Sequence, residues 1–192
     1  MDFLNFVSEA RSCRRFVQEK AISKDDLLWL LTCAAYTPCA RNAQVLRYVA
    51  VHSPQKCAEL FASTRWAGAL KDWGGPHEGE RPTGYIAILS PVDCISLVHM
   101  DLGIAAQTIQ LAAHSKGMGC CMHASFAREA CTNLLQVPEN MQIGLILALG
   151  MAKEERRLAP MPADGNFNYW RDERQVHHVP KRGLDELVLA VL

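Results

Sequence analysis

The stretch that decides the fold is DLGIAAQTIQLAAHSKGMGCCM, residues 101–122. From residue 99 to residue 116 the sequence is rich in small and helix-forming residues, and Gly117 then offers a left-handed position at which a helix ends readily. Residues 118–122 favour a strand. The run QIGLILALG, residues 142–150, has the continuous apolar character of a buried strand. We therefore expect a central helix that packs against a sheet.

Further segments of helical and extended character alternate on both sides of this centre. Ser23, followed three residues later by Asp26, resembles a capping box and introduces a second helix over 24–36. Apolar side chains run nearly all round that helix, so it should be well buried. The other expected elements are helices at 2–10, after Pro54 and from Ser125 to Leu135, and strands at 47–51 and 84–89. This alternation predicts an α/β or α+β sandwich, a sheet covered by helices.

Composition excludes several classes of protein. The chain has 192 residues, 49% of them apolar, and 20 basic residues balance 20 acidic ones. It is long enough to bury a substantial core, so we expect one soluble domain over 1–192. A net charge of zero argues against a nucleic-acid surface. The first ten residues lack the pattern of a secretory signal, and no apolar run is long enough to cross a bilayer. We expect a cytoplasmic protein without a membrane partner, whose eight cysteines are reduced and mostly serve as small apolar fillers.

The composition changes after Gly150. Residues 151–183 are polar, contain three prolines and have no clear periodicity. Such a long irregular segment is unusual in a compact monomer. It is explained if the segment wraps over a partner subunit, where Phe167, Tyr169 and Trp170 would find burial, and a partly disordered tail is the alternative.

Positive charge gathers near the other end of the chain. In RSCRRF, residues 11–16, three arginines surround one serine and one cysteine, although the chain as a whole is neutral. The cluster is either ordinary surface charge beside a helix end or a local site for an anion.

Five separated segments resemble segments typical of one family, the FMN-dependent nitroreductases, and they occur in the expected order. They are ARSCRRF (10–16), TPCARNAQVLRYVAV (37–51), DLGIAAQTIQLAAHSKGMGCCMHASF (101–126), LILALGMAKEE (145–155) and VPKRGLDELV (179–188). The resemblance implies an α+β sandwich whose central, mostly antiparallel sheet is covered by helices. It also implies an intertwined homodimer, with two flavins held at the subunit interface.

The activity that the resemblance implies is a ping-pong oxidoreductase reaction. NADH or NADPH would pass electrons to N5 of FMN, and a small electron-poor acceptor, namely a nitroaromatic, a quinone or a flavin, would take them from the same place. No catalytic side chain is then required. Two alternatives stay open: a specialised flavin reaction on the same fold, such as reductive dehalogenation or flavin breakdown, and a non-catalytic flavin-binding or thiol redox-sensing protein.

The resemblance also assigns residues to the cofactor. It places Arg11, Ser12 and Arg14 on the phosphate and ribityl chain, together with Lys181 and Arg182 from the far end of the sequence. Arg14 could instead face the pyrimidine end of the flavin. Arg15 is expected to face solvent, and Ala10 stands where the family often has a further arginine.

A second set of residues is assigned to the flavin ring. Pro38, Asn42 and Gln44 match positions that contact the ring or the ribityl chain, whereas Cys39, Val45 and Leu46 depart from the family pattern. Gly117 and Gly119 would let backbone amides approach the flavin, or would simply form a helix end and a tight turn. We predict no metal site, because the adjacent Cys120 and Cys121 do not reproduce the spacing of zinc ligands.

Overall fold

The computed structural model describes residues 2–192 and is built around a four-stranded sheet. The strands are β1 (Arg47–Val51), β2 (Gly84–Pro91), β3 (Met118–His123) and β4 (Met141–Met151), in the order β1-β2-β4-β3, and every neighbouring pair is antiparallel. All four were expected from the sequence. β2 and β4 lie at the centre because their side chains are apolar and buried on both faces, whereas β3 forms one edge.

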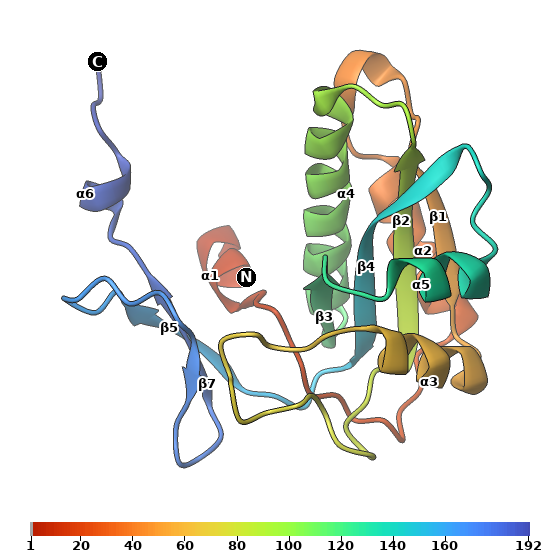
Figure 1. The fold of residues 1–192 in the computed structure, drawn as a ribbon. Coiled ribbons are helices and arrows are strands. Elements are labelled where there is room, and N and C mark those ends of the chain that lie inside the picture. The colour runs from red at the N-terminus through yellow and green to blue at the C-terminus, as the bar shows by residue number, and fades with distance from the viewer. Residues whose placement is uncertain (1) are drawn as a thin grey trace.

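Helices α2 (Lys24–Ala35) and α4 (Ser96–Ser115) cover one face of the sheet (Figure 1). The capping box that starts α2 is present, since Ser23 Oγ accepts from the backbone of Asp26 at 3.0 Å and Asp26 Oδ2 accepts from the backbone of Ser23 at 3.2 Å. α4 ends where expected, and Gly117 takes the left-handed φ of 72° just beyond it. The two helices bury a shared apolar core against the sheet, made by Leu27, Leu30, Ala34, Ala105, Ala106, Ile109 and Ala113.

Helices α3 (Pro54–Ser63) and α5 (Arg128–Leu135) cover the opposite face. Their core includes Cys57, Leu60, Tyr85, Cys121, Cys131 and Ile146. The short helix α1 (Phe3–Glu9) lies outside both layers, and the 3-10 turn η1 (Ala40–Asn42) leads into β1. The sheet with helices on both faces confirms the predicted α+β sandwich.

The C-terminal segment corrects the expectation of irregular chain over 151–183. It contains β5 (Arg156–Pro160), β6 (Trp170–Arg171) and β7 (His177–Lys181), which form a second small sheet in which β5 and β7 are parallel. Figure 1 shows this segment, in blue, standing to one side of the main sheet and leading into the short helix α6 (Leu184–Leu187), after which the chain continues to its C-terminus. Six of the apolar residues from Phe167 to the end of the described chain are exposed: Phe167, Leu184, Leu187, Leu189, Val191 and Leu192.

No helix within residues 2–192 is long and apolar enough to cross a membrane.

Candidate functional site

The segment RSCRRF lies along the outer edge of β3. Ser12 pairs with Cys120 in a parallel bridge, and the backbone N–H of Cys13 donates to the carbonyl of Cys120 at 2.8 Å. Phe16 pairs with Ala152 farther along and is fully buried, as is Cys13. The apolar members of the segment therefore anchor it to the sheet. The backbone pairing fixes the positions from which the arginine side chains extend.

A basic pocket of about 260 Å³ opens beside this segment. Four of the predicted cofactor residues, Arg11, Ser12, Arg14 and Lys181, line it together, although they come from opposite ends of the chain. The remaining walls are formed by Gln107, Gln110, Tyr169, His177 and Val179. Within the described chain, none of the lining residues is acidic. We call this cavity the basic pocket.

Arg14 is held on several sides. Its Nη1 donates to Nε2 of His177 at 3.1 Å, and its guanidinium lies 4.3 Å above the centre of the Tyr169 ring. Its own backbone N–H donates to Oε2 of Glu154 at 2.9 Å. Backbone and side chain are thus fixed independently, so the guanidinium is already oriented in the free protein.

Arg11 is committed in part to the preceding helix, α1. Its Nη2 and Nε donate to the carbonyls of Val7 and Ala10, at 2.7 and 3.1 Å. These bonds satisfy carbonyls at the C-terminal end of α1, where a cation is favourable. Burial, and secondarily the charge of Arg156, lowers the pKa of Arg11 from its ordinary value, yet an arginine remains a cation. Fewer of its N–H groups remain for a ligand than in Arg14.

Beneath the pocket lies a buried ion pair that the sequence did not reveal. Glu154 is fully buried, and its Oε1 accepts from Nη2 and Nε of Arg171 at 2.5 and 3.0 Å. The Arg171 guanidinium in turn lies 4.1 Å from the centre of the Trp73 ring. Because Glu154 also accepts from the Arg14 backbone, one carboxylate connects RSCRRF to the C-terminal segment.

The expectation that Arg15 faces solvent is wrong. Its Nε and Nη2 each donate to one oxygen of Glu80 at 2.6 Å, and Lys153 Nζ lies 3.0 Å from the same carboxylate. The hydrogen bond from Arg15 is the main reason that the pKa of Glu80 falls to about 2, against the opposing effect of burial. The partners lie 65 residues apart in sequence, so no local pattern indicates the pair.

We predict that E80Q destabilises the protein in a pH-dependent way. The folded pKa lies below the usual value of 4.5, so the carboxylate contributes stability above about pH 4.5 and loses it as the pH falls toward 2. At pH 7 the loss should be about 1–3 kcal/mol, since charged hydrogen bonds are removed. Urea unfolding at pH 7, 4 and 3 measures it, with the exposed Glu78 changed to Gln as the control. A wild-type advantage that stays constant across these pH values would contradict the assignment.

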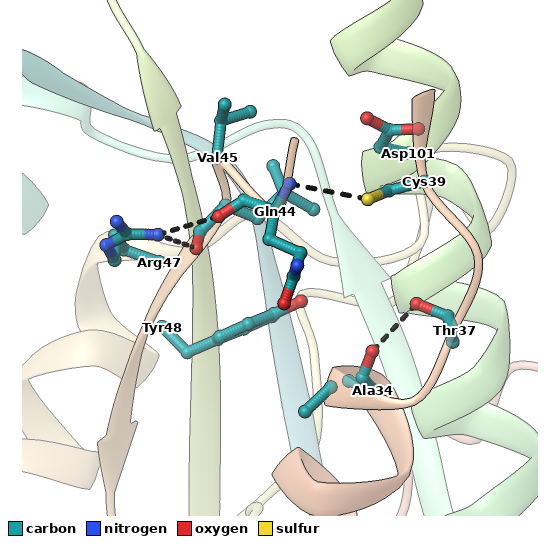
Figure 2. A pocket seen from close by; sticks show the side chains of 10 residues that line it. Ala34, Thr37, Cys39, Gln44, Val45, Arg47, Tyr48 and Asp101 are labelled. Carbon is teal, nitrogen blue, oxygen red and sulfur yellow. Dashed lines mark hydrogen bonds between the residues drawn. The ribbon is translucent and has the colours of Figure 1, made fainter. Parts of the chain in front are cut away.

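The second predicted set lies elsewhere in the chain. Gln44 lines another cavity, of about 220 Å³, together with Thr37, Cys39, Tyr48 and Asp101 (Figure 2). Figure 2 shows the Gln44 amide reaching toward the Tyr48 side chain. Asp101 of α4 fixes the loop, since its Oδ1 accepts from the backbone of Ala40 at 2.8 Å. Within the described residues, this cavity and the basic pocket share no lining residue.

The loop that leads to Gln44 has an unusual backbone. Arg41, Asn42 and Gln44 all have positive φ, between 49° and 56°, which disfavours residues other than glycine. Residues in such conformations cluster at active sites and ligand-binding loops, where the surrounding structure holds the backbone in place. Pro38 and Asn42 lie exposed on this loop, and neither is among the residues that line the two cavities described above.

Arg182 points away from the basic pocket. Its Nη1 donates to Oε2 of Glu186, one helical turn on, at 2.9 Å, and both side chains are exposed. The reason is the alternation of side chains along β7, which places His177, Val179 and Lys181 on the face of the pocket. That alternation also indicates His177, which the sequence reasoning missed because β7 was not expected. Gln107 and Gln110, missed as well, lie three residues apart on one face of α4.

The two predicted glycines serve packing and chain reversal in the folded chain. Gly117 takes the left-handed position after α4. Gly119 faces Cys13 so closely that a Cβ at this position would lie 2.5 Å from Cys13 Sγ and 2.6 Å from its Cβ. The glycine is therefore what allows RSCRRF to lie against β3.

We predict that G119A destabilises the protein by about 1–3 kcal/mol, because the added methyl overlaps a buried side chain. The matched control is G74A, at an exposed loop glycine that has open space around it and no positive φ, and it should change the stability by under about 1 kcal/mol. Thermal or urea unfolding of both variants measures the effects. If G119A were as stable as wild type, the close contact with Cys13 would not be a constraint.

Among residues 2–192 no group of three His, Cys, Asp or Glu side chains is placed to hold a metal ion.

Comparison with known proteins gives a consistent family. The profile of the nitroreductase family matches residues 7–151. A curated relative from Archaeoglobus fulgidus, provisionally named NADH dehydrogenase/NAD(P)H nitroreductase, is 25% identical over 182 residues, which cover 90% of this chain and 97% of the relative. A Desulfovibrio desulfuricans structure solved in complex with FMN has a TM-score of 0.68 at 20% identity and covers 100% of this chain and 98% of its own. An FMN-dependent nitroreductase from Clostridium difficile R20291 has a TM-score of 0.65 at 21% identity, over 88% and 98%. The chain belongs to the nitroreductase family.

Proposed function

We propose that the protein is an FMN-dependent oxidoreductase. It takes electrons from NADH or NADPH and delivers them to a small electron-poor acceptor such as a nitroaromatic, a quinone or a flavin. The observation that carries this proposal is the convergence of Arg11, Arg14 and Lys181 with Ser12 in one basic pocket. Membership of the nitroreductase family and the names of the relatives support the class of reaction.

The residues of the basic pocket fit the phosphate end of FMN. A phosphate carries up to two negative charges near neutral pH and three acceptor oxygens, and it is best bound by several cations and hydroxyl donors. The pocket offers Arg14 and Lys181 as cations, the hydroxyl of Ser12 and the amide of Gln107. The amide of Gln110 donates to the carbonyl of Ala10 at 2.7 Å and therefore supports the wall of the pocket.

FMN, when bound, would supply the two-electron chemistry at its N5 atom. The chain's own residues then need only bind the cofactor, orient it and stabilise its negative charge. Arg14 suits the last task, because its guanidinium is oriented by His177 and Tyr169 before any ligand arrives. The two proposed halves of the flavin site, the basic pocket and the loop with Pro38, Asn42 and Gln44, belong to different parts of one chain.

A homodimer would bring the two halves together. The C-terminal segment stands beside the main sheet with exposed apolar side chains, and α4 exposes Leu97, Met100 and Ile104. A second copy that covered these surfaces would bury them. We propose that residues 151–183 wrap this partner and that Pro38, Asn42 and Gln44 complete a flavin site at the interface. Light scattering coupled to size exclusion tests it: a monomer that still retains FMN contradicts this arrangement.

Two measurements test the proposed function. The protein should bind FMN and show flavin absorption, and it should then consume NADH or NADPH in the presence of a nitro or quinone acceptor. Failure to bind added FMN would overturn the proposal, and binding without consumption would favour a passive flavin carrier. The thiol-sensing alternative is disfavoured at Cys13, whose side chain is fully buried and whose pKa is raised mainly by that burial.

A further inference from the structure

His177 lies under the basic pocket with its two ring nitrogens in different surroundings. The residue belongs to β7 and has no exposed surface. Its Nε2 lies 3.1 Å from Nη1 of Arg14. Its Nδ1 is buried and has no hydrogen-bond partner among residues 2–192, the nearest carboxylate oxygen being Oε1 of Glu154 at 3.9 Å.

The contact with Arg14 determines where the proton of the ring sits. A guanidinium has donors and no acceptor, so Nε2 accepts the bond and carries no hydrogen. The neutral ring therefore bears its hydrogen on Nδ1. Glu154 accepts no hydrogen bond from the ring, because its Oε1 already accepts two from Arg171 and its Oε2 accepts one from the Arg14 backbone.

The charges around the ring favour its neutral form. Burial is the largest cause, and the cations Arg14, Arg171 and Arg156 act in the same direction, while Glu154 opposes them. The pKa of His177 consequently falls to about 4. Tyr169 packs on the ring at 5.0 Å between centroids. At neutral pH the ring is thus a fixed acceptor that faces a cation.

We propose that His177 is a positioning residue that fixes the guanidinium of Arg14 in the basic pocket by accepting one of its hydrogen bonds. Tyr169 lies against the face of the guanidinium and sets its plane, whereas His177 holds one edge within that plane and leaves the other N–H groups for the ligand. The identity of that ligand, FMN, rests on the proposed function. The orientation of Arg14 by a deprotonated Nε2 does not.

Two substitutions distinguish the loss of the hydrogen-bond acceptor from a change in side-chain volume. In H177Q the amide oxygen can reach the position of Nε2, so the variant keeps an acceptor that does not titrate. In H177L the acceptor is lost. Titration of FMN fluorescence at pH 7 should give a dissociation constant about tenfold weaker for H177L and within about threefold of wild type for H177Q. The control is H178Q, since His178 pairs with Asp172 and stacks on Trp170, and it should bind FMN as wild type does.

The pH dependence of FMN affinity distinguishes the proposed role from a purely structural one. As the pH falls from 6 toward 4, the affinity of the wild type for FMN should fall relative to that of H177Q. The two affinities are compared at the same pH, so the protonation of FMN itself affects both equally and cancels from their ratio. Near-ultraviolet circular dichroism at each pH confirms that both proteins are folded. Equal weakening in H177Q and H177L, or parallel pH profiles in wild type and H177Q, would overturn the proposal.

A measurement on the wild type tests the role of His177 without any flavin. Nitrogen-15 NMR of the histidine side chains should show His177 neutral at pH 6, with its hydrogen on Nδ1. A hydrogen on Nε2, or a charged ring, would overturn the role of His177 even if FMN binds. If FMN does not bind the wild type while the Nδ1–H form is found, the proposed function fails and the positioning of Arg14 stands.

Discussion

Replacing Glu154 with leucine is expected to destabilise the protein by about 3–5 kcal/mol, because the change leaves a buried guanidinium without its counter-charge. The carboxylate is fully buried, the Arg171 side chain is only 9% exposed, and two hydrogen bonds join them. Water cannot replace the lost partner at that depth. The backbone N–H of Arg14 also loses its acceptor, so the local cost extends to RSCRRF.

Urea unfolding at pH 7 measures the effect, and the neighbouring residue provides the control. Glu155 pairs with Arg157, but both side chains are more than half exposed, so E155L should cost under about 1 kcal/mol. The double variant E154L/R171M removes both charges and should recover a large part of the stability lost in E154L. Equal stability of E154L and E155L would mean that the buried pair does not hold the C-terminal segment to the sheet.

The main sheet and its helices were predictable because their signals are local. An apolar run such as 142–150 is long enough to indicate a buried strand without reference to its partners, and the Ser23 capping box marks the start of α2. The strands β5 and β7 give no such signal. They are polar, and each is held in a strand by its pairing with the other, which lies about twenty residues away in the sequence.

The candidate site was predictable in part for the same reason. Family resemblance indicated Arg11, Ser12, Arg14 and Lys181, which the fold then places in one pocket. It could not distinguish Lys181 from Arg182, because that distinction depends on the alternation of side chains along an unexpected strand. The pairs Arg15–Glu80 and Arg171–Glu154 were hidden as well, since only the folded chain brings their members together.

The double variant R14A/K181A is expected to weaken FMN binding by roughly 100-fold. Within the described chain, Arg14 and Lys181 are the two cations of the basic pocket whose charged groups donate to no carboxylate and no backbone carbonyl, whereas Arg11 donates to two carbonyls. Each charged hydrogen bond to a phosphate contributes about 1.5–3 kcal/mol, so the loss of two costs at least about 3 kcal/mol of binding free energy. Titration of FMN fluorescence against the apoprotein measures the dissociation constant, and unfolding curves confirm that the variant is folded.

The controls test the selectivity that the geometry requires. R157A removes an exposed arginine outside the pocket and should bind FMN as wild type does. R15A should lower the stability, because it breaks the pair with Glu80, and yet leave the affinity nearly unchanged. Since Arg182 is engaged with Glu186, R182A should weaken binding far less than K181A. If R182A and K181A weakened binding equally, the alternation of side chains along β7 would not decide which cation meets the phosphate.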